Sequence, residues 1–391
     1  MFFKSIQLSF ISSLLLASNL YADDGFDDEN EFGSDEIELV QIEQSEQNDF
    51  TLYGSVTATG EYSTIGNSIV STKLSTNLKL EYIVDEFHKI KSTIKGYKAT
   101  NTNINNDRGF DINELSVEGI FHNGIDGKIG RQIVVWGKSD NIRITDILNP
   151  MDMTTPGMVD IKDLRLGVAM TKLDYFMDKW ALSGMVLHEN RFSTMAEFGS
   201  EYYRATMPDA PSNSLSNSGT ALSLSGNLQG EDISFYLANK YVDNTTYKTN
   251  MVGFAYNKVM DSFLIKTEVA YFDNYDSNTI DGKTDGLVGV EYNGISDGSI
   301  SFEVANKNDD IQYALRFTQS YLNQTLDFTT LYSGYGKNLE DGGFARVWFD
   351  YAYDDNISTS FGVIDYFGGD NLYFENIKDN DRVFASLTYN F

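Results

Sequence analysis

The sequence predicts an all-β protein: a transmembrane, antiparallel up-and-down β-barrel of about eighteen strands, with about sixteen as the alternative count. Three observations support this prediction. From residue 49 onward, apolar and polar residues alternate in segments of about ten residues, as in strands with one face in lipid. The connections between these segments alternate between short and long. The four prolines, at positions 150, 156, 208 and 211, all lie outside the alternating segments, as expected for a chain that is nearly all strand.

Residues 1–22 have the features of a secretory signal peptide. Lys4 precedes an apolar run at 6–16, and the small residue Ala22 precedes the acidic Asp23. The run is too short to cross roughly 30 Å of hydrocarbon as a helix. We therefore expect a cleaved export signal and a Gram-negative outer-membrane location, with residues 49–391 forming the barrel.

Residues 23–48 form an acidic leader with eleven acidic residues and no lysine or arginine. This composition predicts a disordered periplasmic linker. The alternative is a short helix over 35–44, with Ile37, Val40 and Ile42 on one side. Such a helix would plug the barrel or bind a periplasmic partner.

The composition excludes several classes of protein. The absence of cysteine excludes disulfides, thiolate metal sites and cysteine nucleophiles. A formal net charge of −28 argues against nucleic acid as a partner. We expect no cofactor and no metal, because the Asp-rich stretch 273–282 lacks the ligand spacing of a calcium loop. The 24 tyrosines, 26 phenylalanines and 32 glycines suit aromatic girdles and tight strand packing.

The alternating segments give each predicted strand one apolar and one polar face. Phe263, Ile265 and Val269 alternate with Lys266 and Glu268, so the charged face needs a wet bore and the apolar face needs lipid. Barrels of this strand number are wide enough for an aqueous channel. The predicted segments lie near 50–58, 73–82, 88–99, 108–121, 125–137, 164–176, 179–189, 218–228, 231–242, 249–260, 262–273, 285–295, 298–306, 310–321, 324–334, 343–353, 357–367 and 381–391.

The connections predict the orientation of the barrel. Tight turns, such as those near 85–87 and 229–230, alternate with longer connections such as 138–163 and 190–217. Short periplasmic turns and longer outside loops are typical of outer-membrane barrels, so both ends of the barrel should be periplasmic. One outside connection, 307–309, is shorter than expected.

The chain ends on a strand-like segment, 382–391, in which every second residue from Val383 to Phe391 is apolar. Its free edge is tolerable if it pairs with the first strand. This ending resembles the C-terminal signal of Gram-negative outer-membrane barrels. The resemblance implies that Tyr389 and Phe391 are recognised by the barrel-assembly machinery.

The most distinctive stretch is 130–152, GRQIVVWGKSDNIRITDILNPMD. It resembles the signature of a family of proteobacterial outer-membrane barrels of unknown function, sometimes described as porin-like. The resemblance covers about 110–195, and the chain is short for that family. It implies an outer-membrane barrel that passes a poorly known solute, with an apolar one as a candidate, and it supplies no catalytic residues. The matching residues are Gly130, Arg131, Gln132, Trp136, Gly137, Asp140, Arg143, Asp146, Asn149, Pro150 and Asp152.

Within this stretch, Ile142, Ile144, Ile147 and Leu148 have a spacing that predicts a short helix ending before Pro150. Because a partly apolar outside loop needs somewhere to be buried, we expect 138–163 to fold into the barrel and constrict it. The alternative is a lid on the outer rim. The predicted constriction residues are Arg131, Trp136, Asp140, Arg143, Asp146, Asn149 and Asp152.

Arg131 conflicts with strict alternation, which places it on the lipid face beside Ile129 and Ile133. An arginine at the middle of the membrane costs about 2–4 kcal/mol there. We therefore expect a β-bulge near Gly130 that turns Arg131 inward.

Alternation also predicts two charged sets that face each other across the bore. Opposed charges would order water and favour dipolar solutes, whereas the alternative is ordinary lumen charge that solvates the bore. The acidic outside loops favour a weak preference for cations. The basic set is Lys73, Lys79, Lys91 and Lys95, and the acidic set is Glu291, Glu303, Asp327 and Asp350.

These features predict a passive channel for small solutes and not an enzyme. The channel could form a homo-oligomer. The competing class is a non-conducting barrel that acts as a receptor, adhesin or structural protein. A hydrolase is a remote alternative, because His188 beside Glu189 is the one histidine at the outer end of a strand, and a catalytic base must be positioned with its partners.

Overall fold

The computed structural model describes residues 49–391 apart from 101–106, 123, 244, 246 and 274–281. The barrel lies within one compact unit, Asn48–Phe391. The predicted signal peptide, the acidic leader with its helix at 35–44, and most of the rejected calcium loop lie outside the described residues.

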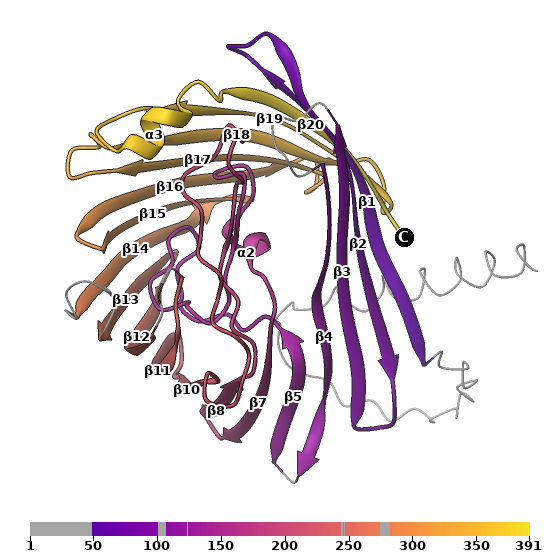
Figure 1. Cartoon of the computed structure of the whole chain (residues 1–391), viewed down its shortest axis with the longest axis vertical. Helices are drawn as coiled ribbons and strands as arrows, with labels where there is room; N and C mark the ends of the chain where they lie inside the picture. The colour runs from indigo at the N-terminus through magenta and orange to yellow at the C-terminus, as the bar shows by residue number, and fades with distance from the viewer. Residues whose placement is uncertain (1–48, 101–106, 123, 244, 246, 274–281) are drawn as a thin grey trace, which may run out of the picture. The chain divides into compact units, whose positions relative to one another are not determined.

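Eighteen strands pair antiparallel in sequence order and close into a barrel, because β1 pairs with both β2 and β20 (Figure 1). The predicted fold and the count of eighteen are confirmed. The barrel strands are β1 (Phe50–Ser63), β2 (Ser68–Ile83), β3 (His88–Thr100), β4 (Arg108–His122), β5 (Ile125–Gln132), β7 (Val168–Met177), β8 (Trp180–Leu187), β10 (Gly219–Asn227), β11 (Glu231–Tyr241), β12 (Lys248–Met260), β13 (Phe263–Asp273), β14 (Lys283–Ile295), β15 (Gly298–Lys307), β16 (Asp310–Tyr321), β17 (Leu326–Tyr335), β18 (Gly342–Ala352), β19 (Ile357–Phe367) and β20 (Arg382–Asn390).

The remaining elements are short. β6 (Asp152–Met153) and β9 (Thr194–Met195) pair in parallel and belong to two long connections. The helices are α2 (Ile161–Leu164) and α3 (Leu372–Ile377). Neither helix of the described chain has the length and hydropathy needed to cross a membrane.

Short and long connections alternate as predicted except at 64–67 and 308–309, where connections at the end with the longer loops are short. Gln229–Gly230 joins β10 to β11, and both residues have positive φ, which gives the tight turn that matches strand twist. Asn308 and Asp309 also have positive φ, which explains the short connection at the end of the barrel that otherwise carries the longer loops. The two longest connections, 133–167 and 188–218, contain all four prolines.

The two faces of the sheet differ in composition because side chains alternate across a strand. Leu74, Phe235, Val252 and Phe361 are 47–57% exposed on the outer face, as residues that face lipid should be. On the inner face, Lys266, Glu268 and Glu303 are nearly inaccessible. The interior is therefore filled at the level of these residues.

Residues 133–167, here called the inward loop, lie inside the ring of strands together with α2 (Figure 1). Their apolar side chains pack on inward side chains of β7 to β16 in a buried cluster. Cluster members with at most 4% exposure include Trp136, Ile142, Ile144, Leu148, Met170, Tyr236, Met251, Phe272 and Leu287.

The inward side of β1 to β4, here called the polar wall, is not covered in the same way. The Tyr53 residue is 43% exposed, and the side chains of Lys89 and Lys91 are 41% and 39% exposed. The barrel interior is thus asymmetric, with a dry cluster on one side and an accessible polar surface on the other.

The chain terminus lies at the seam of the barrel. Phe391 donates its N–H to the Gly54 carbonyl and accepts from the Gly54 N–H, at 3.0 and 2.8 Å. Its ring stacks with that of Tyr389 at 6.3 Å. The last residue therefore extends the pairing between β20 and β1, in agreement with the predicted closure.

Deletion of Phe391 should lower the yield of folded barrel in the outer membrane several-fold, because it removes two seam hydrogen bonds and the terminal aromatic ring. The folded fraction is measured by the shift in gel mobility between unheated and heated membranes. The matched control is Tyr353→Ala, an exposed aromatic at a turn on the same end of the barrel. Equal yields for the deletion and the control would contradict an assembly role for the terminus.

Candidate functional site: a loop anchored across the bore

The inward loop is closed at its base by Asn149. The Asn149 side-chain oxygen accepts from the Val134 N–H at 2.8 Å, and its amide donates to the carbonyls of Gln132 and Leu166 at 3.1 and 2.8 Å. Entry and exit strands of the loop are therefore tied through one buried amide.

A buried charge cluster stiffens the first half of the loop. The Asp146 carboxylate pairs with Arg143 at 3.1 Å and with Arg165 at 2.8 Å. Arg143 also donates to the carbonyls of Asp146 and Asn149. These bonds hold the loop in a fixed irregular shape because every charge has a partner.

The helix predicted between Asp140 and Pro150 is wrong, because no helix forms there. Its backbone groups have other partners: Ser139 Oγ donates to the Ile142 carbonyl, and the Thr145 N–H donates to Glu268. The apolar residues are nevertheless buried, since Ile142, Ile144 and Leu148 pack on the barrel wall.

Two carboxylates of the wall bind the loop backbone. Glu268 of β13 accepts from the N–H groups of Lys138, Ser139 and Thr145 at 2.6–3.0 Å, and from the Thr145 hydroxyl at 2.8 Å. Glu303 of β15 accepts from the N–H groups of Asp140 and Asn141 at 2.9 and 3.0 Å. Both carboxylates are enclosed, so they serve the loop and do not face the bore.

Gly137 allows this close approach. Its φ is +86°, and a Cβ there would lie 2.7 Å from a Glu268 oxygen and 2.9 Å from the Thr145 hydroxyl. A side chain at this position would displace the loop from the carboxylate that holds it.

An aromatic pair and two lysines complete the contact with the far wall. Trp136 stacks on Tyr236 with ring centroids 4.7 Å apart. Lys266 pairs with Asp140 and, at 2.8 Å, with Glu291. Lys240 donates to the Ile147 carbonyl at 2.8 Å.

The second half of the loop is held by Asp160, which precedes α2. Its carboxylate pairs with Arg316 of β16 at 2.9 Å and with Arg346 of β18. Burial raises the pKa of Asp160, but the two guanidinium groups outweigh burial and hold the pKa below its ordinary value. The loop therefore spans from its base at β5 and β7 to strands on the opposite part of the ring.

Residues 188–218, here called the second loop, support the inward loop. β9 of this loop pairs with β6, and the Met151 N–H donates to Ser193 Oγ at 3.0 Å. The hydroxyl groups of Tyr202 in the second loop and Tyr366 in β19 are 3.2 Å apart. The Tyr366 hydroxyl donates to the Pro156 carbonyl of the inward loop at 2.6 Å.

The second loop is also tied to the seam strands. Arg382 of β20 pairs with Glu61 of β1 at 2.9 Å and with Glu201 of the second loop at 3.0 Å. The barrel closure and the position of the loop are thus linked through one buried arginine.

The bulge predicted near Gly130 is absent, because β5 pairs without interruption across this residue with both neighbours. Gly130 instead takes a φ of +127°, and the Arg131 guanidinium pairs with Glu189 and donates to the Ile112 carbonyl at 3.1 Å. A register shift lies in β4 instead, opposite Thr93 and Ile94. The charge of Arg131 is satisfied by partners from β4 and the second loop, which single-strand alternation does not reveal.

Of the predicted constriction residues, all but Arg131 belong to the inward loop. Trp136, Asp146 and Asn149 are buried, and Asp140 has a 56% exposed side chain. Asp152 starts β6 and accepts from the Thr154 N–H and hydroxyl. These residues fix the loop, whereas few of them offer a charge to the bore.

The basic set lies on the polar wall. Lys91 pairs with Glu118 at 2.7 Å, whereas Lys73 and Lys79 lie over the rings of Tyr97 and Tyr53 at 5.6 and 5.7 Å. Lys95 donates to the Asp163 carbonyl at 3.4 Å.

The acidic set is divided. Glu291 and Glu303 lie on β14 and β15, on the far side of the ring from β2 and β3; Glu303 binds the loop backbone, whereas Glu291 pairs with Lys266. Asp327 accepts from Ser320 at 2.5 Å, and Asp350 accepts from Trp348 Nε1 at 3.0 Å. β17 and β18 lie near the seam, not opposite the basic set.

His188 and Glu189 do not form an acid–base pair in the structure. His188 Nε2 lies 2.9 Å from the Thr171 hydroxyl, and Glu189 accepts from Arg131 and from the Ala169 N–H. His188 is therefore not held by Glu189 in the way that a catalytic acid–base pair requires.

The sequence identified the inward loop but missed its anchors. Alternation places Lys266 and Glu268 on the inner face, yet nothing in the local pattern links them to residues 138–145. Alternation likewise places Arg316 and Arg346 on the inner face without their partner Asp160, and Asp160, Arg165 and Lys240 were not predicted as anchors.

Three solved structures of outer-membrane proteins are similar to this chain. OccK11 (OpdR) of Pseudomonas aeruginosa has a TM-score of 0.54 at 9% identity, over 88% of this chain and 96% of that one. OpdK of Pseudomonas aeruginosa, solved with vanillate, also has a TM-score of 0.54 at 9% identity, over 88% of this chain and 98% of that one. A variant of the Rh. blastica porin has a TM-score of 0.45 at 12% identity, over 88% and 100% of the two chains.

At 9% identity, the likeness to OccK11 and OpdK shows a shared barrel fold. Comparison with curated protein sequences finds no match. One family model matches residues 45–291, which is more than half of the chain and reaches well beyond the stretch 110–195 that carried the resemblance. The chain therefore belongs to the DUF1302 family, described as a protein of unknown function.

Proposed function

We propose that the chain is an outer-membrane channel for passive diffusion of small polar solutes, and that the inward loop constricts it. The observation that carries this proposal is the asymmetry of the interior. The loop packs against β7 to β16 and is anchored by Glu268, Glu303 and Asp160, while the polar wall keeps accessible side chains. Solutes pass between the loop and the polar wall.

The chemistry of the polar wall favours polar solutes over apolar ones. Lys89 and Lys91 share Glu118 at 3.3 and 2.7 Å, and Lys128 lies 3.6 Å from the same residue. A dense array of paired charges binds water strongly, so an apolar solute would have to displace that water. The family resemblance suggested an apolar solute as a candidate, but the charged polar wall favours a polar one.

The test is planar-bilayer conductance of the refolded chain and of a variant in which 138–163 is replaced by a short Gly–Ser linker. The wild type should give steady single-channel currents, and the variant should conduct several-fold more, because the packed loop is removed from a bore wide enough for an aqueous channel.

A barrel that is silent both with and without the loop would overturn the channel proposal and favour the receptor or structural alternative. A variant with unchanged conductance would overturn the role of the loop alone. The fold of each preparation is checked by its heat-dependent gel mobility, so that an unfolded sample is not counted as a silent one.

A further inference from the structure

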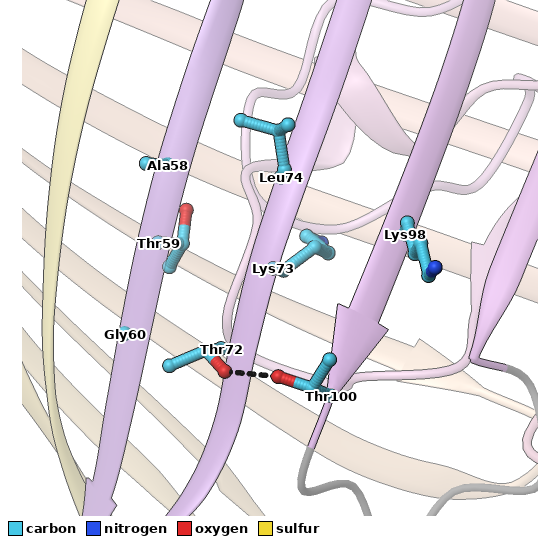
Figure 2. A pocket seen from close by; sticks show the side chains of 8 residues that line it. All are labelled: Ala58, Thr59, Gly60, Thr72, Lys73, Leu74, Lys98 and Thr100. Atoms are coloured by element: carbon cyan, nitrogen blue, oxygen red, sulfur yellow. Dashed lines mark hydrogen bonds between the residues drawn. The ribbon is translucent and has the colours of Figure 1, made fainter.

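A shallow hollow of about 500 Å³ lies on β1, β2 and β3, and its lining includes the inward residues Thr59 and Lys73 as well as outward residues of the same strands. Figure 2 shows Leu74 and Lys98 on neighbouring strands and the hydrogen bond between Thr72 and Thr100. The outward-facing members of its lining are Ala58, Gly60, Thr72, Leu74, Lys98 and Thr100.

The hollow exists because small residues meet across adjacent strands. Gly60 pairs with Thr72 and with Ala385, and Thr72 pairs with Thr100. A Cβ built at Gly60 would meet nothing within 4 Å. Larger outward residues border this strip, since Leu74 is 54% and Tyr62 is 42% exposed. The surface is therefore a trough across the strands, with apolar sides.

Two cations lie side by side at the edge of this trough. Lys98 is exposed and pairs in register with Leu74 on one side and Arg108 on the other. The Arg108 side chain is 79% exposed and lies 3.1 Å from Asp107. Among the described residues, no carboxylate lies within ion-pair distance of Lys98. The neighbouring sequence 101–106, NTNINN, contains no charged residue. With Asp107 offsetting one of the two cations, the patch is net positive, and it lies beside threonine hydroxyls and apolar side chains.

The height of the patch matches the surface of the membrane. Thr72 lies ten positions from Tyr82 along β2, and Tyr82 is 45% exposed near the opposite end of the barrel. At about 3.3 Å per residue and a tilt near 40°, this separation corresponds to roughly 25 Å along the barrel axis, the height of the apolar band. Lys98 and Arg108 therefore lie at the level of lipid headgroups on the side of the longer loops.

We propose that this hollow binds a phosphorylated lipid of the outer leaflet. The phosphate is bound by Lys98 and Arg108, the Thr72 and Thr100 hydroxyls lie beside the headgroup, and an acyl chain lies over Gly60 and Ala58 beside Leu74. Basic groups beside lipid-facing apolar surface recognise anionic headgroups by this combination. The inference rests on the membrane location in the proposed function, and it is independent of conductance.

The test is native mass spectrometry of the folded chain in detergent, titrated with diphosphorylated lipid A. The wild type should retain the lipid, and the double variant Lys98→Ala, Arg108→Ala should weaken retention about 25-fold, which is roughly fivefold for each cation. The single variant Lys98→Arg should retain most of the wild-type binding, because it keeps the positive charge. The matched control is Lys258→Ala, a strand lysine at the other end of the barrel that pairs with Glu231.

Equal retention by the double variant and the wild type would overturn the proposal, as would equal retention of dephosphorylated lipid A. Displacement of the lipid by millimolar inorganic phosphate would identify a free-anion site and would also overturn it. Because folding is checked by gel mobility and conductance is measured separately, loss of lipid in a conducting barrel is distinguishable from failure of the channel proposal.

Discussion

Replacing Glu268 by alanine should release the first half of the inward loop from the barrel wall. The substitution leaves the buried N–H and hydroxyl of Thr145 and the partly buried N–H groups of Lys138 and Ser139 without their acceptor. Unsatisfied buried donors cost about 1–3 kcal/mol each, so a destabilisation of about 3 kcal/mol or more is expected even after local relaxation. The released loop should become a substrate for trypsin at Lys138 and Arg143, while the wild type resists cleavage.

The measurement is limited trypsin digestion of the refolded barrel with mass analysis of the fragments, together with urea unfolding in detergent. Glu268→Gln should give an intermediate result, because one oxygen remains an acceptor while the new NH₂ group faces donors. The matched control is Glu231→Ala, which removes an accessible pair with Lys258 at the rim and should change little. Identical cleavage of the Glu268→Ala and wild-type proteins would contradict the anchoring role.

Replacing Asp160 by asparagine should detach the second half of the loop and raise conductance. The change leaves Arg316 and Arg346 without their shared carboxylate, and Arg346 also donates to the Gly157 carbonyl at 2.9 Å. Breaking a largely buried charged contact of this kind costs about 3 kcal/mol. Single-channel recording should show a larger and noisier current than the wild type, whereas an unchanged current would remove Asp160 from the account.

The same contact predicts a pH dependence. The folded pKa of Asp160 lies below its ordinary value of 3.8, so its stabilisation is fully present above that value and is lost as the pH falls through the lower folded pKa. Lowering the pH from 8 to 5 should therefore leave this contact intact. Once the pH falls through that folded pKa, wild-type conductance should approach that of Asp160→Asn, whose own response to acid lacks this component.

The sequence allowed the strand count, the alternation of connections and the closure to be predicted, because each depends on local information. The period of two reports which residues share a face, and proline marks where strands are interrupted. The burial of the inward loop was also predictable, since Ile142, Ile144 and Leu148 need an apolar partner. Their partners are inward side chains such as Met251 and Phe272.

The shape and anchors of the loop were not predictable from the same information. The helical spacing of the isoleucines was outweighed by side chains that bind the backbone, above all Glu268, which lies 123 to 130 positions away in sequence. Alternation gives the face of Glu268, but its height in the barrel depends on the stagger of all strands between β5 and β13. For the same reason, Arg131 could be recognised as misplaced, while its partner Glu189 could not be identified.

Thiol accessibility tests the central claim most directly: solvent follows the polar wall, and the loop fills the other side. The chain has no cysteine, so single cysteines can be placed at Ser75 on β2 and at Ala255 on β12, both small inward residues. In a bilayer, a charged thiol reagent should rapidly reduce the current through Ser75→Cys and leave Ala255→Cys unchanged. Rapid modification of Ala255→Cys with no effect at Ser75→Cys would contradict the account.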